Sequence, residues 1–382
     1  MKVVVFEDND SKFGVLQNVL IGKGINSISI RRIQHVAEFA KLRGDQFDLC
    51  IVDIRMPSLP GGETRSAGGE ILQMLSYGGY EGIPVLAITA YADEIAEQRE
   101  AFAERGCIIY DFDQQEHWTN ALDIFISQAR SKGKYDFIIF TAIRPERDAY
   151  SCFSELEIKS VQNGGLDCWD CEIDGRLGTI ILLPRMGLVN AAISVSRALE
   201  LFSPRVVAMS GICGGIGDRA ELGQLLVTDM CYEYQSGKWI KDAFEADPYQ
   251  VAVPETVKND LRLLIGDKSI LAELESGYSG SKRPENISRP KLAVFATGSA
   301  VIASKSYLSQ VEHFHRKVSG IDMEIFGFHR AVELSGNSAL SFSSKVVVDK
   351  AKENKGDELH EYGCYVSAGF TIKSIKRILS PQ

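Results

Sequence analysis

The sequence DLCIVDIRMP, at residues 48–57, contains an apolar run that ends in a carboxylate, Asp53. Short apolar runs bounded by polar residues are typical of buried strands. Outward from it, similar runs alternate with helical patterns on both sides. This alternation predicts an α/β fold, in which helices cover both faces of a parallel sheet and functional residues gather at the carboxyl ends of the strands. The predicted strands lie near residues 2–6, 27–31, 48–52, 84–88 and 107–110.

A second series of strands and helices follows a polar stretch, SQARSKGK, at residues 127–134. Because domains usually hold roughly 100–200 residues, a chain of 382 residues is expected to contain two. We place the first domain at residues 1–130, a linker at 131–136 and the second domain at 137–382. The polar segment 266–290 is expected to be a functional lid or a disordered loop. The second domain is predicted to have strands near 136–141, 179–183, 205–210, 224–229, 292–296 and 345–349, and helices at 188–201, 254–265, 304–317, 323–334 and 357–378.

The composition, with 45% hydrophobic and 24% charged residues, is typical of a globular protein. A net charge of −9 argues against nucleic acid as a partner, because such binding needs a basic face that displaces counterions from phosphates. No apolar run approaches the roughly 18 residues of a membrane-spanning helix. The first residues turn acidic at Glu7 and lack the apolar core of a signal peptide. We therefore expect a cytoplasmic protein with no membrane contact.

The eight cysteines are scattered, mostly in apolar segments, which predicts reduced thiols rather than a disulfide framework. Cys168 and Cys171 form an isolated Cys-x-x-Cys pair. A structural zinc site usually needs four ligands, and no second pair follows. We therefore interpret this pair as part of a surface turn.

Acidic residues follow two of the first predicted strands: Glu7 and Asp8 come after KVVVF, and Asp53 comes after DLCIV. Three carboxylates at one sheet edge suit Mg²⁺, and one of them can act as a nucleophile toward a phosphoryl group. The hydroxyl of Thr89, which ends the next strand in LAIT, could bind the phosphoryl oxygens. Taken singly, such an Asp is more often a turn residue or a helix cap.

Together, EDxD, IVDxRMP and LAITA resemble the receiver domains of two-component response regulators, over essentially all of residues 1–130. The resemblance implies a flavodoxin-like (βα)5 fold in which Asp53 is the phosphoacceptor. It also implies that Glu7, Asp8 and Asp53 hold Mg²⁺ and that Thr89 is the switch hydroxyl. A histidine kinase or a phosphotransfer protein is then the expected partner.

Two features depart from the receiver pattern. Receivers normally carry a lysine at the end of the fifth strand, but residues 107–114 read CIIYDFDQ, without a lysine. The phosphoryl group would thereby lose a pairing cation. The second feature is a glycine-rich segment, PSLPGGETRSAGG at residues 57–69, which is longer than the usual loop and is expected to be a partner-specific surface.

The second domain carries chemistry-bearing residues at four places in its predicted strands and helices. Glu146 lies at the start of a helix, where the dipole favours an acid. Glycines follow the strand RVVA in MSGICGG, at residues 209–215, and allow a ligand to approach the backbone closely. Glu324 opens another helix, and Asp349 ends the strand KVVVD. Each of these features also has a purely structural interpretation.

As a set, these pieces resemble the nucleoside phosphorylase superfamily, and particularly its methylthioadenosine and S-adenosylhomocysteine nucleosidases. The resemblance covers about residues 135–380 and implies a three-layer α/β fold. Superfamily members usually form dimers or hexamers, so a homo-oligomer is expected. The matching pieces are AxxxE at 142–146, a helix start at Gly187, SGxxGG at 210–215, ATGSAVIAS at 296–304, DME at 322–324 and Asp349.

Cleavage of a purine N-glycosidic bond passes through an oxocarbenium-like ribose, so the enzyme must protonate the leaving base and supply a nucleophile. The resemblance assigns Asp349 as the general acid and Glu146 as the residue that orients water. No cofactor is expected for this chemistry. The substrate-binding residues that the resemblance implies are Glu324 for the ribose hydroxyls, Met323 against the sugar, Gly214 in the glycine turn, and Val301 and Ile302 in the base pocket.

The choice between hydrolysis and phosphorolysis depends on a phosphate site. Bacterial phosphorylases of this superfamily place an arginine and a serine beside the glycine turn, where this chain has Met209 and Ile212. Neither side chain can bind phosphate, so hydrolysis is favoured. The usual serine before the catalytic aspartate is Val348 here.

A receiver joined to a nucleosidase is expected to be an effector that a signal switches on. The architecture resembles effectors of Detocs antiphage systems, which cleave ATP to adenine and ribose 5′-triphosphate. An adenine nucleotide substrate needs cations near its 5′ end, and Arg144, Arg147 and Arg185 lie close to the motifs. Solvated surface charge is the other interpretation of these arginines. Further cations of the 266–291 segment are Lys282, Arg283, Arg289 and Lys291.

Two other functions stay open from the sequence. One is a regulated housekeeping nucleosidase for methylthioadenosine or S-adenosylhomocysteine, whose thioether tail would suit an apolar 5′ pocket. The other is a catalytically silent nucleoside sensor, against which the retention of Glu146, Glu324 and Asp349 argues.

Overall fold

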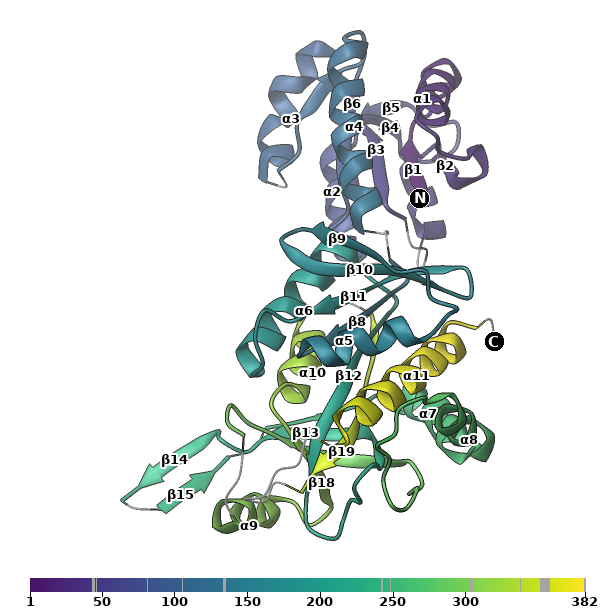
Figure 1. Cartoon of the computed structure of the whole chain (residues 1–382). Helices are drawn as coiled ribbons and strands as arrows, with labels where there is room; N and C mark the ends of the chain where they lie inside the picture. The colour runs from purple at the N-terminus through teal and green to yellow at the C-terminus, as the bar shows by residue number, and fades with distance from the viewer. Residues whose placement is uncertain are drawn as a thin grey trace. The chain divides into compact units, whose positions relative to one another are not determined.

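The chain divides into two compact units, Met1–Gly133 and Lys134–Gln382 (Figure 1). The computed structural model describes residues 1–42, 45, 47–80, 82–104, 106–132, 135–241, 243–247, 249–301, 305–336, 338–350 and 358–380. Within these residues, no helix combines the length and the apolar composition needed to span a bilayer.

The first unit is built on a five-stranded parallel sheet in the order β2-β1-β3-β6-β7. Alternate residues of a strand point to opposite faces, so Val3 and Val5 enter one core and Val4 and Phe6 the other. Helices α1 (Asp10–Gly22) and α4 (Gln115–Lys132) cover the first face, and α2 (Gly68–Tyr77) and α3 (Ala92–Glu104) cover the second. The strands are β1 (Val3–Phe6), β2 (Ile30–Ile33), β3 (Leu49–Asp53), β6 (Val85–Thr89) and β7 (Ile109–Asp111).

Some element boundaries of this unit differ from the prediction. Residues Ser27–Ser29 form a 3₁₀ turn capped by Asn26, and the strand begins only at Ile30. Helix α4 extends to Lys132, so the predicted linker is helical at its first two residues. The glycine-rich segment closes a small hairpin of β4 (Arg55–Pro57) and β5 (Thr64–Ser66).

The second unit contains a ten-stranded mixed sheet. Strands β8, β12 and β19 are mutually parallel, so their carboxyl ends lie at one edge of the sheet. Strand β18 joins that edge through pairing with Gly214 and Gly215. The strands are β8 (Phe137–Thr141), β9 (Lys159–Asn163), β10 (Leu166–Ile173), β11 (Arg176–Leu182), β12 (Val206–Gly215), β13 (Leu225–Glu233), β16 (Gln250–Ala252), β17 (Lys291–Thr297), β18 (Val318–Asp322) and β19 (Leu340–Asp349), with a separate hairpin of β14 (Gly237–Ile240) and β15 (Ala243–Ala246).

Helices cover both faces of this sheet. In β8, Phe137 and Ile139 enter one core, and Ile138 and Phe140 enter the other. Helices α6 and α10 pack together on the second of these cores, and α7 and α11 pack on the first. The helices are α5 (Arg144–Asp148), α6 (Leu188–Phe202), α7 (Glu255–Gly266), α8 (Lys268–Gly277), α9 (Lys305–Phe314), α10 (Ile325–Leu334) and α11 (His360–Leu379).

Two predictions for this unit were wrong. The polar segment 266–290 contains helix α8, whose first turn is capped by the Asp267 carboxylate accepting from Ser269. Cys168 and Cys171 are buried in strand β10 rather than exposed in a turn. Three residues apart on a strand, they point into opposite cores, so they do not form one metal site.

Candidate active site and acidic cluster

Glu146 is held at the carboxyl end of β8 by three backbone donors. Its Oε2 accepts from the N–H groups of Ala142 and Ile143, at 2.7 and 3.1 Å. Its Oε1 accepts from the N–H of Ile212, at 2.9 Å. The side chain is 2% exposed. Burial raises the pKa of Glu146, while the nearby Lys345 ammonium opposes that rise.

Residues 209–215, predicted from the sequence as a glycine-rich turn, instead form the end of strand β12, and two of their glycines leave room for carboxylates. A Cβ atom on Gly211 would lie 1.9 Å from Oε1 of Glu146, so no larger residue fits while Glu146 keeps this position. A Cβ on Gly214 would lie 3.2 Å from Oδ1 of Asp349, which is its partner in the pairing of β12 with β19. The end of β12 therefore brings its backbone close to both acids.

Glu324 and Asp322 share a buried cation, Lys345. The Lys345 ammonium donates to Oε2 of Glu324 at 3.1 Å and lies 3.5 Å from Oδ2 of Asp322. The other Glu324 oxygen accepts from the N–H of Gly187, at 3.0 Å. Although burial lowers the pKa of Lys345, the charges of Glu324, Glu146 and Asp322 raise it on balance, so the lysine stays charged.

These groups surround one cavity of about 200 Å³, which we call the acidic cavity. The predicted residues that line it are Glu146, Gly214, Val301, Met323, Glu324 and Asp349. Ile302 lies outside the described residues. The side chains of Ile212 and Val348 also line the cavity, whereas Met209 is buried in the core. Lys345 and Asp322 also line the cavity; the sequence analysis did not single out Lys345 and gave no role to Asp322, the first residue of the DME motif.

A second cavity, of about 860 Å³, adjoins the first and shares Ala142, Ile143, Met186 and Met323 with it. Three arginines line it, Arg144 and Arg185 from the prediction and Arg197 from α6, so we call it the arginine cavity. All three are exposed, and the described residues give none of them an ion pair.

Other predicted cations lie elsewhere. Arg147 pairs with Asp167 at 2.8 Å and stacks over the Trp169 ring at 4.3 Å. Lys282 lies 3.7 Å from Glu358. The Lys291 ammonium donates to the carbonyl of Arg219. Arg283 and Arg289 line a different cavity beside α8. None of these five side chains lines either cavity as the described residues define them.

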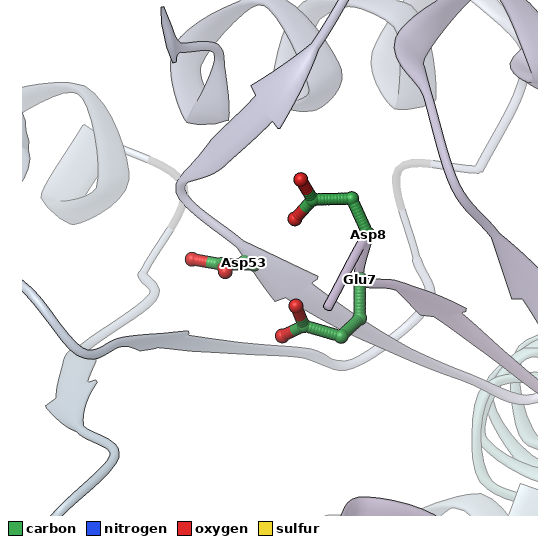
Figure 2. A group of neighbouring side chains, drawn as sticks. All are labelled: Glu7, Asp8 and Asp53. Carbon is green, nitrogen blue, oxygen red and sulfur yellow. The ribbon is translucent and has the colours of Figure 1, made fainter. Parts of the chain in front are cut away.

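The first unit brings together Glu7, Asp8 and Asp53, which we call the acidic cluster. One carboxylate oxygen from each lies within 4.8 Å of the others. Figure 2 shows the three carboxylates gathered at the ends of their strands. Burial and the charge of Asp53 raise the pKa of Glu7 to about 7, and burial raises the pKa of Asp53. Three hard oxygen donors at this spacing fit a divalent cation such as Mg²⁺.

A lysine from the first turn of α1 contacts the acidic cluster. The Lys12 ammonium pairs with Oδ2 of Asp53 and lies 3.1 Å from Oε2 of Glu7. Thr89 follows Ile88, the residue paired with Asp53 across β3 and β6, and its hydroxyl accepts from the N–H of Tyr91 at 3.0 Å. Lys12 was not among the site residues predicted from the sequence.

Acids from strand ends and helix starts surround one cavity of this mixed α/β sheet. The chain belongs to the phosphorylase superfamily, which matches residues 146–371.

Among curated proteins, the chain is 26% identical to the uncharacterized protein y4jS of Sinorhizobium fredii, with all of both chains covered. It is 24% identical to the ATP nucleosidase Cap17 of Escherichia coli over 56% of this chain and 45% of that protein, so it spans less than half of that relative. Among solved structures, the 5′-methylthioadenosine/S-adenosyl homocysteine nucleosidase of Helicobacter pylori has a TM-score of 0.52 at 15% identity, covering 64% of this chain and 99% of that one. This likeness concerns the fold.

Proposed function

We propose that the second unit hydrolyses the N-glycosidic bond of ATP or a related adenine nucleotide, releasing adenine and ribose 5′-triphosphate. The observation that carries the proposal is the pair of adjoining cavities, one lined by acids and one by arginines to which the described part of the chain gives no ion pair. The similarity to an ATP nucleosidase supports the same substrate.

In the proposed reaction, Asp349 donates a proton to the base nitrogen as the bond between that base and the anomeric carbon breaks. A water oxygen bonds to the anomeric carbon, and Glu146 accepts a proton from this water. Glu324 accepts hydrogen bonds from ribose hydroxyls, and Lys345 offsets the charge of the clustered acids. The backbone donors to Glu146 fix the direction of its carboxylate.

The proposed role of Glu146 predicts an acid limb in the pH profile. Glu146 must be ionised to accept a proton, and burial raises its pKa above the ordinary 4.5. As the pH falls through this raised pKa, the ionised form is lost and kcat/KM falls. We expect the limb at a pH above 4.5 in adenine-release assays, with circular dichroism showing that the protein stays folded. A limb at or below 4.5 would contradict this role.

The arginine cavity predicts a selective effect on nucleotides. In Arg185→Ala, KM for ATP is expected to rise by about tenfold or more, because a charge-assisted contact to phosphate is lost. Adenosine has no phosphate, so its kcat/KM is expected to stay unchanged. Arg262→Ala, in an exposed arginine of α7, is the matched control. Equal losses for ATP and adenosine would argue against phosphate binding in this cavity.

We further propose that the first unit is a receiver domain of the flavodoxin-like type that controls the nucleosidase. Its parallel strand order, 2-1-3-4-5 along the chain, agrees with this type of sheet. The acidic cluster would hold Mg²⁺, which would offset phosphoryl charge, and Asp53 would take the phosphoryl group from a histidine kinase or phosphotransfer protein. Such a switch would suit an antiphage effector.

The test is chromatography of products after incubation of the full chain with ATP, adenosine and methylthioadenosine in parallel, with and without acetyl phosphate and Mg²⁺. Both parts of the proposal would be supported if the chain releases adenine from ATP, if acetyl phosphate stimulates this release, and if the stimulation is lost in Asp53→Ala. Stimulation that persists in Asp53→Ala would argue against the switch. An absence of adenine from every substrate would favour the silent sensor.

A second candidate function is a regulated nucleosidase for methylthioadenosine or S-adenosylhomocysteine. The arginine cavity is also lined by apolar side chains, including Leu183, Met186 and Ile193, which suit a thioether tail. Adenine from methylthioadenosine but not from ATP would favour this candidate.

A further inference from the structure

The position of Lys12 is unusual for a lysine. It lies in the first turn of α1, where the helix dipole favours acids and disfavours cations. Its backbone N–H donates to the capping Asn9 side chain at 3.1 Å, so the residue is fixed close to the helix start. The side chain is 14% exposed and reaches inward to Asp53 and Glu7. The site therefore gains a cation at some cost to the helix.

The Lys12 side chain also lies beside the end of β7. Its ammonium is 5.4 Å from the centre of the Phe112 ring, and Phe112 follows β7 directly. The N–H of Phe112 donates to the Thr89 carbonyl at 2.7 Å, which holds this ring beside the strand that ends in Thr89. The residues that directly follow β7 provide no cation of their own, because 112–114 read FDQ.

Charge balance indicates what this cation does. A phosphoryl group on Asp53 replaces the single negative charge of this carboxylate with a charge of roughly −1.5 to −2. This charge lies next to the carboxylates of Glu7 and Asp8. One divalent cation offsets only part of this charge. The Lys12 ammonium already contacts Oδ2 of Asp53, and its four-carbon stem is flexible, so a phosphoryl group on that carboxylate lies within its reach.

We propose that Lys12 pairs with the phosphoryl group on Asp53 and thereby takes the place of a lysine after β7. The inference rests on the proposed phosphoacceptor role of Asp53. In the transfer, an Asp53 oxygen bonds to the phosphorus of acetyl phosphate, the bond from phosphorus to the acetate oxygen breaks, and acetate leaves. Lys12 stabilises the charge on the transferred oxygens without entering into the bonds.

The test compares the full chain with Lys12→Gln, Lys12→Arg and Lys23→Gln. Lys23 lies at the other end of α1 and pairs with Asp123, so it is the matched control. Phosphoprotein formed with acetyl phosphate and Mg²⁺ is followed by phosphate-affinity electrophoresis, and Mg²⁺ affinity by calorimetry. The phosphorylation rate is expected to fall about tenfold to a hundredfold in Lys12→Gln, to recover in part in Lys12→Arg, and to stay unchanged in Lys23→Gln.

Two outcomes would overturn the inference. If Lys12→Gln is phosphorylated at least as fast as the natural chain and binds Mg²⁺ more tightly, Lys12 is a counter-ion that competes with the metal. If the natural chain forms no phosphoprotein while Mg²⁺ binds, the phosphoacceptor proposal fails, and this inference fails with it.

Discussion

Replacing Asp349 with asparagine is expected to lower kcat for adenine release from ATP by about 10²- to 10⁴-fold, the usual contribution of a general acid. Asparagine has nearly the same shape and fits beside Gly214, but it cannot deliver a proton to the departing base. Substrate binding should change little, so KM is expected to stay within about threefold. Steady-state chromatography of adenine measures both constants.

A substrate whose leaving group needs no proton separates this role from a structural one. In a ribose 5′-triphosphate that carries p-nitrophenol at the anomeric carbon, the leaving group departs as the stable p-nitrophenolate anion. Asp349→Asn is therefore expected to cleave this substrate nearly as fast as the natural chain does. Asp260→Asn, in a surface aspartate that pairs with Arg377, is the control for loss of a carboxylate elsewhere. Equal damage to both substrates in Asp349→Asn would mean that Asp349 acts through the structure.

The acids of the site could be predicted because each follows a recognisable local signal. Glu146 lies in the short helix that follows strand β8, Asp349 is the last residue of strand β19, and the carboxyl ends of these parallel strands meet at one edge. Glu324 opens a helix after another strand. These signals are local in sequence, whereas the assignment of residues as far apart as Glu146 and Asp349 to one site came from the resemblance of the whole set to the nucleoside phosphorylase superfamily.

The residues that sequence analysis missed depend on contacts between distant segments. Arg197 lies within helix α6 and looks like an ordinary solvated arginine until the helix packs beside Gly165. Gly211 looks like an ordinary glycine in the sequence, because the carboxylate that leaves no room for its Cβ belongs to Glu146, in helix α5. Helix α8 was hidden by the glycine, serine and proline of the segment around it, since composition averages over the short helix.

Lys345 is the clearest example of a residue that the sequence could not reveal, because the stretch SFSSKVVVD contains no nearby acid that would indicate an ion pair before Asp349. In the structure it is 1% exposed and lies between Asp322 and Glu324, which are 7% and 3% exposed. We expect Lys345→Met to lower the free energy of unfolding by about 3–5 kcal/mol, the usual cost of leaving buried charge unpaired. Adenine release should be lost as well. Urea denaturation at neutral pH measures the first effect.

The pH dependence and a matched variant identify the cause of that loss. Burial raises the pKa of Asp322 above its ordinary 3.8, and removal of Lys345 raises it further. The folded state then binds a proton that the unfolded state releases, so Lys345→Met should regain stability as the pH falls below neutral. Lys258→Met is the control, because Lys258 is also mostly buried but pairs with the exposed acids Asp229 and Glu255, and it should cost about 1 kcal/mol or less. Equal losses in the two variants, or a loss in Lys345→Met that does not change with pH, would show that the pairing of buried charge is not the cause.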